Sequence, residues 1–218
     1  DSTLHGGQGP LQVSEQRSAR GITPAFIHAA MQCGIQRNDD FNGLDPEGVG
    51  YYQVTQFHGG PRNGERCSAA AAYLHPVMQH RANLHVRTET QALRVVLANR
   101  RAVGVEVRRA GVKEVIRARR EVALCGGAFN SPQLLMLSGT GAPAQLTPHG
   151  IEVAHALPGV GQNLQDHCDF ILAWRSKVTD LFGIGAAGTW NLAKAIAQWR
   201  RHGRGMNASP CARAGGFL

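Results

Sequence analysis

Hydrophobic and polar residues alternate along much of the stretch from residue 84 to residue 120, and this period of two predicts β-strands that bury one face. Valines such as Val95, Val105 and Val107 fill one set of positions, while arginines and a lysine fill the other. Residues 99–101 and 110–111 have the composition of turns. We therefore predict an antiparallel meander of four strands, at residues 84–88, 92–97, 102–109 and 112–117.

The pattern changes at residues 121–125, where the apolar run is continuous and stops at two glycines, Gly126 and Gly127. A continuous run of this kind predicts a strand that is covered on both faces, as in a parallel sheet. Ser131-Pro132 is typical of a helix start, and Gly139 is a normal helix stop. We predict a strand, a glycine corner and a helix in that order.

The flanking segments are richer in loops, with turn signals such as Gly9-Pro10 and Asn42-Gly43 before residue 66. Thr23-Pro24 predicts a helix cap followed by a proline in the first helical position. The remaining elements that we expect are a helix up to Gly34, a strand at residues 51–57, a helix at 69–80 that begins at Ser68, a strand at 170–176 and a helix at about 189–201.

Composition excludes several classes of protein. Hydrophobic residues make up 43% of the 218 residues and charged residues only 17%, so the chain is expected to fold. Its apolar runs are far shorter than the roughly 20 residues of a membrane span. The five cysteines are widely spaced, which argues against a disulfide framework and against a zinc site. We expect a cytoplasmic protein and leave open a peripheral association with the inner membrane.

The formal net charge of +8 raises the question of an acidic partner. Many of the cations lie on the polar positions of the meander, without stacking aromatics, so we interpret them as a solvated face and expect no nucleic acid. Two other functions stay open: a basic module that binds RNA or anionic lipid, and an interaction domain without a cofactor. The GxGxxG string at residues 183–188 lacks the flanking strand and the later acidic residue of a dinucleotide fingerprint, so we interpret it as a glycine loop.

The glycine corner at residues 126–132 is the strongest candidate site from the residues themselves. Glycines allow a backbone to approach a ligand closely, and the free N–H groups at a helix start favour an anion such as a pyrophosphate. The alternative is a tight turn that Ser131 merely caps.

The longer string GAFNSPQLLMLSGTG at residues 127–141 closely resembles the second motif of the glucose–methanol–choline (GMC) oxidoreductases, with Thr140 in place of the usual aliphatic residue. Other segments are similar to landmarks of the same family, in the family's order. They are GGQGPLQV (6–13), DFNG (40–43), GVGYYQ (48–53), GERCS (64–68), NLHV (83–86), RAVGVE (101–106) and LPGVGQNLQDH (157–167). The resemblance is greatest to bacterial choline-dehydrogenase-like members.

This resemblance implies an FAD-dependent alcohol dehydrogenase or oxidase that acts on a small primary or secondary alcohol, with the electron acceptor undefined. It implies cofactor contacts at Ala92, through backbone groups that meet the adenine edge, and at Gly127, Ala128 and Ser131. It places Asn163, Asp166 and His167 near the flavin, the alternative for the last two being a capped turn. No catalytic residue is predicted, because the His pair of the family is expected beyond the last residue. No metal ligand is predicted either.

The expected fold is α/β (α+β): part of an FAD/NAD(P)-binding-type domain with a β-meander, interleaved with part of an antiparallel-sheet substrate domain. The resemblance assigns residues 1–65 and 168–218 to the substrate domain and residues 66–167 to the FAD-binding domain. Because the GxGxxG strand–helix start of the family is not found before Asp1, we expect an internal segment that is inactive by itself.

Overall fold

The computed structural model describes residues 4–16, 21–174, 185–203 and 213–218. The chain divides into two compact units. Unit 1 comprises Asp1–Leu84 and Ala173–Leu218, and unit 2 comprises His85–Leu172. The assignment of residues to an FAD-binding and a substrate domain stays a prediction.

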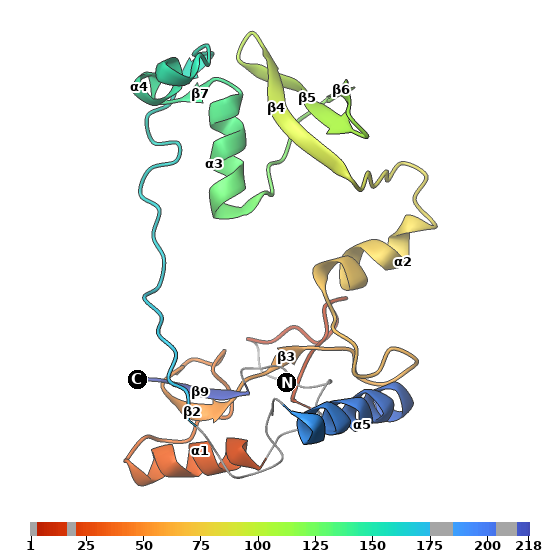
Figure 1. Cartoon of the computed structure of the whole chain (residues 1–218), viewed down its shortest axis with the longest axis vertical. Coiled ribbons are helices and arrows are strands. Elements are labelled where there is room, and N and C mark those ends of the chain that lie inside the picture. The colour runs from red at the N-terminus through yellow and green to blue at the C-terminus, as the bar shows by residue number, and fades with distance from the viewer. Residues whose placement is uncertain (1–3, 17–20, 175–184, 204–212) are drawn as a thin grey trace. The chain divides into compact units, whose positions relative to one another are not determined.

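Most of the helices and strands are labelled in Figure 1. Those of unit 1 are β1 (Val13–Ser14), α1 (Ile22–Gln32), β2 (Gly48–Tyr51), β3 (Val54–Thr55), the π-helical turn η1 (Ala70–Leu74), α2 (His75–Met78), α5 (Ala186–His202) and β9 (Ala214–Phe217). Those of unit 2 are β4 (Thr90–Ala98), β5 (Arg101–Arg109), β6 (Val112–Arg117), α3 (Gly127–Leu137), β7 (Thr140–Gly141), α4 (Pro143–Leu146), the 3-10 turn η2 (Thr147–His149) and β8 (His155–Ala156).

The predicted meander is confirmed for three of its four strands. Strands β4, β5 and β6 form an antiparallel sheet in that order, with Val95 opposite Val105 and Val107 opposite Glu114. Residues 84–88 have no strand assignment, so the prediction of a first strand there is wrong. No described segment pairs with them, and a short apolar stretch without a partner strand has no ladder to join.

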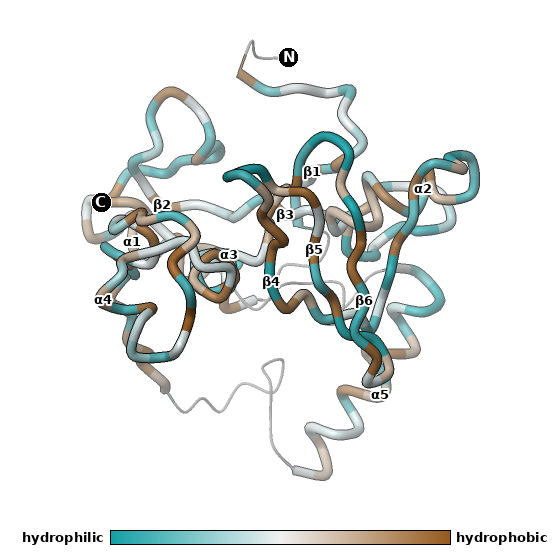
Figure 2. The backbone as a smooth tube through the Cα atoms, turned by 90° about the horizontal axis from the view of Figure 1, so that it is seen from above, coloured by the Kyte–Doolittle hydropathy of each residue, from teal (hydrophilic) through white to brown (hydrophobic). Residues whose placement is uncertain are grey.

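Hydrophobic and hydrophilic residues alternate along these strands, as Figure 2 shows by colour, and their burial follows the alternation. Val95 and Val107 are buried, with 6% and 4% of their surfaces exposed, whereas Arg108 and Arg117 are exposed. Strand β6 departs from the pattern, because Val115 lies opposite Glu106 on the polar face and is 47% exposed. The cations therefore lie on a solvated face.

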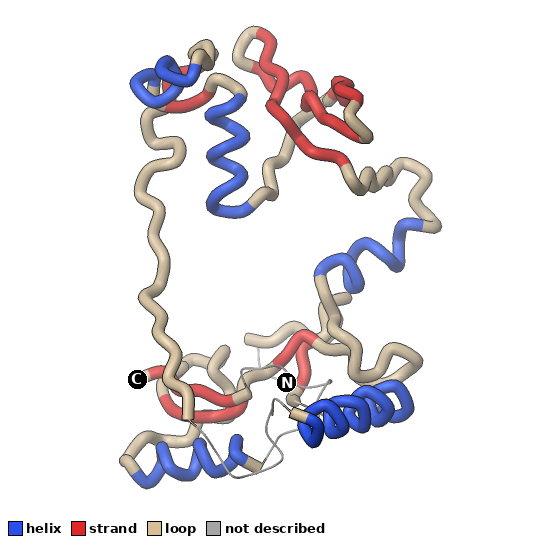
Figure 3. The backbone as a smooth tube through the Cα atoms, in the orientation of Figure 1, coloured by secondary structure: helices blue, strands red, loops and turns tan. Residues whose placement is uncertain are grey.

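The segment between the sheet and α3 differs from its prediction. Residues 121–125 form no strand and alternate between exposed and half-buried (Figure 3). A strand needs a neighbouring strand to share its ladder of hydrogen bonds, and no described segment pairs with this one. Helix α3 starts at Gly127, four residues before the predicted start, and Ser131 lies inside it, where its hydroxyl accepts a hydrogen bond from the Gly126 N–H at 3.0 Å.

Unit 1 has two small antiparallel pairs, β1 with β3 and β2 with β9. The predicted strand at 51–57 is instead split, since β2 ends at Tyr51 and β3 covers only Val54–Thr55. Helix α1 starts at Ile22 rather than after Thr23, because Thr23 is buried inside its first turn and caps nothing. The helix expected at 69–80 is present as η1 and α2, and the Ser68 hydroxyl accepts a hydrogen bond from the Ala71 N–H as a cap should.

The helix predicted at 189–201 is confirmed as α5, which starts three residues earlier. Its last turn meets the loop before Cys67: the Trp199 indole donates a hydrogen bond to the Gly64 carbonyl at 3.3 Å, and Gly203 ends the helix with φ of 60°. Of the predicted strand at 170–176, residues 170–174 are not a strand and the other two lie outside the described residues. The glycine loop predicted at 183–188 also falls partly outside the described residues, and the prediction is wrong for residues 186–188, which form the first turn of α5.

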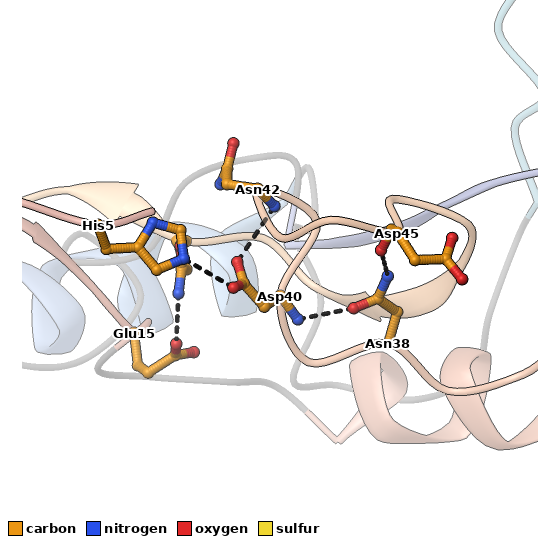
Figure 4. Close-up of polar contacts among 7 residues, drawn as sticks. His5, Glu15, Asn38, Asp40, Asn42 and Asp45 are labelled. Atoms are coloured by element: carbon orange, nitrogen blue, oxygen red, sulfur yellow. Dashed lines mark hydrogen bonds and ion pairs between the residues drawn. The ribbon is translucent and has the colours of Figure 1, made fainter. Parts of the chain in front are cut away.

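A polar cluster joins the first residues of unit 1 to the loop before β2 (Figure 4). The His5 imidazole donates a hydrogen bond from Nε2 to Oδ2 of Asp40 at 2.7 Å, and the Asn42 N–H donates to Oδ1 of the same carboxylate. The His5 hydrogen bond is the main reason that the pKa of Asp40 lies below its ordinary value; partial desolvation opposes it. Asn38 orders the same loop by donating to the Asp45 carbonyl.

The lowered pKa of Asp40 predicts acid sensitivity. A carboxyl whose pKa is lower in the folded state adds stability above its unfolded-state pKa, and this contribution is lost as the pH falls through the folded-state value. We expect the free energy of unfolding to fall below about pH 4, and to fall less steeply in Asp40→Asn. Urea denaturation across this range measures the slope. Asp39→Asn is the control, because Asp39 binds Arg37 instead of His5; equal slopes in the two variants would contradict the assignment.

Candidate functional site

A groove of about 610 Å³ lies in unit 2 between the start of β4, the segment before α3 and α3 itself. We call it the unit 2 groove. Its lining residues are Gln91, Ala92, Leu93, Val105, Val122, Ala123, Leu124, Cys125, Gly126, Asn130, Ser131, Gln133, Leu134 and Leu137. Its volume lies within the range of roughly 300–1,000 Å³ that is usual for small-molecule and cofactor sites.

One wall of the groove is the outer edge of β4, the first strand of the meander. Ala92 lies opposite Val107 and Arg94 opposite Glu106, so Leu93 is an extra residue that has no partner in β5. This β-bulge interrupts the usual alternation of directions in which backbone groups point. Farther along β4, the Val95 N–H points away from β5, because it donates to a hydroxyl of α3.

The bulge fixes the direction of the Ala92 backbone. In an antiparallel pair, hydrogen-bonded residue pairs alternate with non-hydrogen-bonded pairs, and residues of the non-hydrogen-bonded pairs direct their N–H and C=O away from the partner strand. Val95, whose N–H points away from β5, lies opposite Val105. Ala92 lies opposite Val107, two residues farther along β5, so Ala92 is also in a non-hydrogen-bonded pair. The Ala92 N–H and C=O therefore point out of the sheet edge, toward the groove that Ala92 lines.

The opposite wall is the turn into α3. A Cβ atom on Gly126 would lie 3.0 Å from the Asn130 Cβ and 3.2 Å from the Ser131 nitrogen, so this turn is closed tightly. Gly127 has φ of 81°, which side chains disfavour, and a Cβ atom there would meet nothing within 4 Å. The corner therefore leaves open space at the first residue of a helix, where backbone N–H groups have no partner within the helix.

The charge of the groove comes from the helix and not from side chains. None of its lining residues carries a formal charge. Glu106, an acidic residue of β5, is bound to Arg94 on the polar face, and this hydrogen bond holds the pKa of Glu106 below its ordinary value. The N-terminal end of α3 provides a partial positive charge of about half an elementary charge, which favours an anionic ligand there.

The structure brings some of the predicted site residues together. Ala92 and Ser131 line the unit 2 groove on its two sides. Gly127 and Ala128 are not among the lining residues, but they directly follow Gly126, which lines the groove. Ser131 lines the groove and its hydroxyl accepts a hydrogen bond from the Gly126 N–H, but Ser131 lies inside α3 and Gly126 is the N-cap residue, so the cap expected at Ser131 is not found there.

Asn163, Asp166 and His167 lie elsewhere in unit 2, in an exposed segment that does not line the groove. Asn163 has φ of 56°, and the Asp166 carboxylate accepts a hydrogen bond from the N–H of the next residue, His167, at 2.9 Å. Residues 162–170 have no turn assignment, so both the flavin contact and the capping alternative stay predictions. The functional role of all seven residues stays a prediction.

Sequence reasoning missed several residues that form this groove. Val122, Ala123, Leu124 and Cys125 line it, although the predicted buried strand would have hidden them. Leu93 was missed because a bulge depends on pairing between strands and leaves no mark on a single sequence. Cys125 had one usable signal, its position directly before Gly126; it is exposed and free.

Two negative findings concern the described residues only. No helix in the described part of the chain has the length and apolarity to cross a membrane. Among the same residues, no three histidine, cysteine or acidic side chains gather in a group that could hold a metal ion.

Comparison with known sequences finds one family along most of the chain. The sequence profile of the family described as "GMC oxidoreductase" matches residues 3–169. An alcohol dehydrogenase [acceptor] of Pseudomonas putida is 39% identical over the whole chain, which covers 39% of that protein. The mitochondrial choline dehydrogenase of Homo sapiens is 45% identical over 78% of the chain, which covers 28% of that protein. The chain thus spans less than half the length of these curated relatives.

Comparison with solved structures gives the same picture. A formate oxidase of Aspergillus oryzae RIB40, studied for FAD modification, superimposes with a TM-score of 0.80 at 25% identity over 97% of this chain and 36% of that one. A fungal aryl-alcohol oxidase superimposes with a TM-score of 0.73 at 26% identity over 95% of this chain and 35% of that one. The expected α/β fold with an FAD-binding-type part is therefore confirmed.

Proposed function

Because this chain belongs to the GMC oxidoreductase family, whose members are FAD-dependent, we propose that its protein oxidises a primary or secondary alcohol and that the unit 2 groove holds the ADP part of the cofactor. The observation that carries the proposal is the pairing of two backbone features across one groove. These are the outward-facing N–H and C=O of Ala92 and the open helix start at Gly126–Gly127.

The residues of this chain fit an adenine nucleotide. Adenine has a donor and an acceptor on one edge, and one extended residue offers the complementary acceptor and donor with its backbone, so the Ala92 side chain need not take part. Leu93, Val105 and Leu134 provide an apolar lining for the base. The start of α3 offers free N–H groups to a pyrophosphate, and Gly127 leaves room for it, with Ala128 the next residue of the helix.

The division of labour follows from this arrangement. When bound, the flavin supplies the acceptor for hydride from the alcohol, while the protein binds, orients and shields the reactants. Here Ala92, Gly127, Ala128 and Ser131 bind or shape the nucleotide half. We assign Asn163, Asp166 and His167 to the flavin side, and we assign removal of the alcohol proton to no residue of this chain.

The substrate and the location are inferred more broadly. Relatives named for alcohols and for choline support a small alcohol, choline-like or other, and the electron acceptor stays open between oxygen and another molecule. The four described cysteines are free, which supports a cytoplasmic location. The ion pairs Arg94–Glu106 and Arg87–Glu114 support a solvated basic face, so we propose no second function for it.

Protection of Cys125 tests the groove. Cys125 lines it and is exposed, so iodoacetamide should modify this thiol readily in the free protein. A nucleotide in the groove should slow the modification about tenfold, because only the small unbound fraction reacts. The protein is expressed from its complete reading frame, and FAD or ADP is added at about tenfold its dissociation constant. Mass spectrometry resolves the rate at each cysteine.

The chain contains its own control for this experiment. Cys33 is exposed in unit 1 and should react at the same rate with either nucleotide, within about twofold. Cys168 is also exposed; ADP, which lacks the flavin, should leave it unchanged, whereas FAD is expected to slow it if the segment at 163–167 borders the flavin. An unchanged rate at Cys125 in protein that carries FAD would place the cofactor elsewhere and overturn the proposal.

A further inference from the structure

A hydroxyl at the end of α3 connects the two walls of the unit 2 groove. Ser138 follows Leu137, the last residue of the helix, and its Oγ accepts a hydrogen bond from the Val95 N–H of β4 at 2.7 Å. The same hydroxyl donates its proton to the Leu134 carbonyl, one turn earlier, at 2.5 Å. Ser138 therefore joins the last turn of α3 to the strand whose edge forms the other wall.

The Val95 N–H needs this partner. Val95 is 6% exposed, and its N–H points away from β5, so the ladder offers it no acceptor. Among the strands that the structure describes, β4 is at the edge of the order β4-β5-β6, with no strand on that side. A buried N–H without an acceptor is destabilising, because it has lost its water without a replacement. The Ser138 hydroxyl supplies that acceptor at a single point.

The position of this contact matters for the bulge. Val95 lies two residues after Leu93, the extra residue, while Ala92 lies directly before it. If the bulge moved by one residue, or if β4 paired with β5 without a bulge, the N–H and C=O of Ala92 or of Val95 would point toward β5 instead of away from it. An acceptor fixed at Val95 favours the register in which both residues point outward.

We propose that Ser138 is a positioning residue for cofactor binding, which acts through Val95 to hold the bulge of β4 and the outward backbone groups of Ala92 against the groove. The inference rests on the proposed function, since it assumes that Ala92 meets the adenine. It adds a specific division: Ser138 supports the adenine end of the groove, whereas the start of α3 receives the pyrophosphate without it.

The test compares Ser138→Ala with Ser138→Thr in protein expressed from the complete reading frame. Dissociation constants are measured by calorimetry for FAD, for ADP and for riboflavin 5′-phosphate, which has no adenine. Ser138→Ala should raise the dissociation constants of FAD and ADP about tenfold, because without an acceptor for the Val95 N–H the register that points Ala92 outward is less stable. The dissociation constant of riboflavin phosphate should change by less than about twofold. Ser138→Thr keeps the hydroxyl and should restore FAD binding to within about threefold of the parent protein.

Hydrogen exchange supplies a second readout. The Val95 amide should exchange about tenfold faster in Ser138→Ala, and near the parent rate in Ser138→Thr. Thr147→Ala is the matched control. The Thr147 hydroxyl also donates to a carbonyl four residues earlier, that of Pro143 at 2.9 Å, but has no hydrogen bond to a strand. It should leave the three affinities and the Val95 exchange rate unchanged.

Each outcome decides between the proposals. Equal weakening of all three ligands in Ser138→Ala would reduce Ser138 to a structural residue, and unchanged FAD and ADP affinities would overturn its positioning role. Failure of the parent protein to bind FAD would overturn the proposed function itself. Unchanged Val95 exchange in Ser138→Ala would overturn the contact on which the inference rests, whatever the ligand.

Discussion

An Ala92→Pro variant is expected to bind FAD at least about tenfold more weakly than the parent protein, because proline removes the outward N–H that the adenine edge would use and leaves a polar atom of the base unpaired. The sheet itself should tolerate the change. Proline is accepted on edge strands where the N–H faces away from the neighbour, and Ala92 lies at such a position in β4. The loss should therefore appear in the dissociation constant and not in the melting temperature.

Ala92→Ser is the matched control, because it changes the side chain but keeps the backbone donor and acceptor. It should bind FAD within about twofold of the parent protein. Calorimetric titration with FAD and thermal melting without it separate the two effects. A proline variant that retains full affinity would show that the backbone of Ala92 does not meet the base. A proline variant that melts far below the parent would show that the Ala92 N–H belongs to the ladder, against the register argument.

A Gly64→Ala variant is expected to lose about 3 kcal/mol of unfolding free energy. Gly64 has φ of 83°, and a Cβ atom on it would lie 2.2 Å from the carbonyl oxygen of Gly203, the residue that ends α5. The methyl group therefore adds both backbone strain and a clash with main chain that cannot rotate away. The clash would also separate Trp199 from the Gly64 carbonyl, which its indole N–H now bonds.

Gly59→Ala separates these two causes. Gly59 lies in the same loop with φ of 78°, but a Cβ atom there would meet nothing within 4 Å. Backbone strain alone should cost it about 1 kcal/mol. Urea denaturation gives the difference between the variants, which isolates the contact of Gly64 with Gly203. If both variants lost the same free energy, α5 would not be held by this contact.

Local patterns were sufficient where the structure depends on neighbours in the chain. The alternation of valines and arginines identified three strands and their polar face, and the helical spacing near Trp190 identified α5 within three residues. The glycines before Ser131 identified the corner of the site, although the helix there starts earlier than its capping residues suggested. The motif at residues 127–141 was specific enough to indicate the family and its cofactor.

The contacts that shape the site join residues far apart in the chain, and no local pattern encodes them. The bulge at Leu93 arises from the register of β4 on β5, and the bond from Val95 to Ser138 joins residues 43 positions apart. The strand predicted from the apolar run at residues 121–125 is wrong, because hydrophobicity indicates that residues tend to be buried but does not indicate which element packs against them. Periodicity fixes which way side chains face within one element, whereas strand register and close approaches between glycines such as Gly64 and Gly203 depend on how distant elements meet.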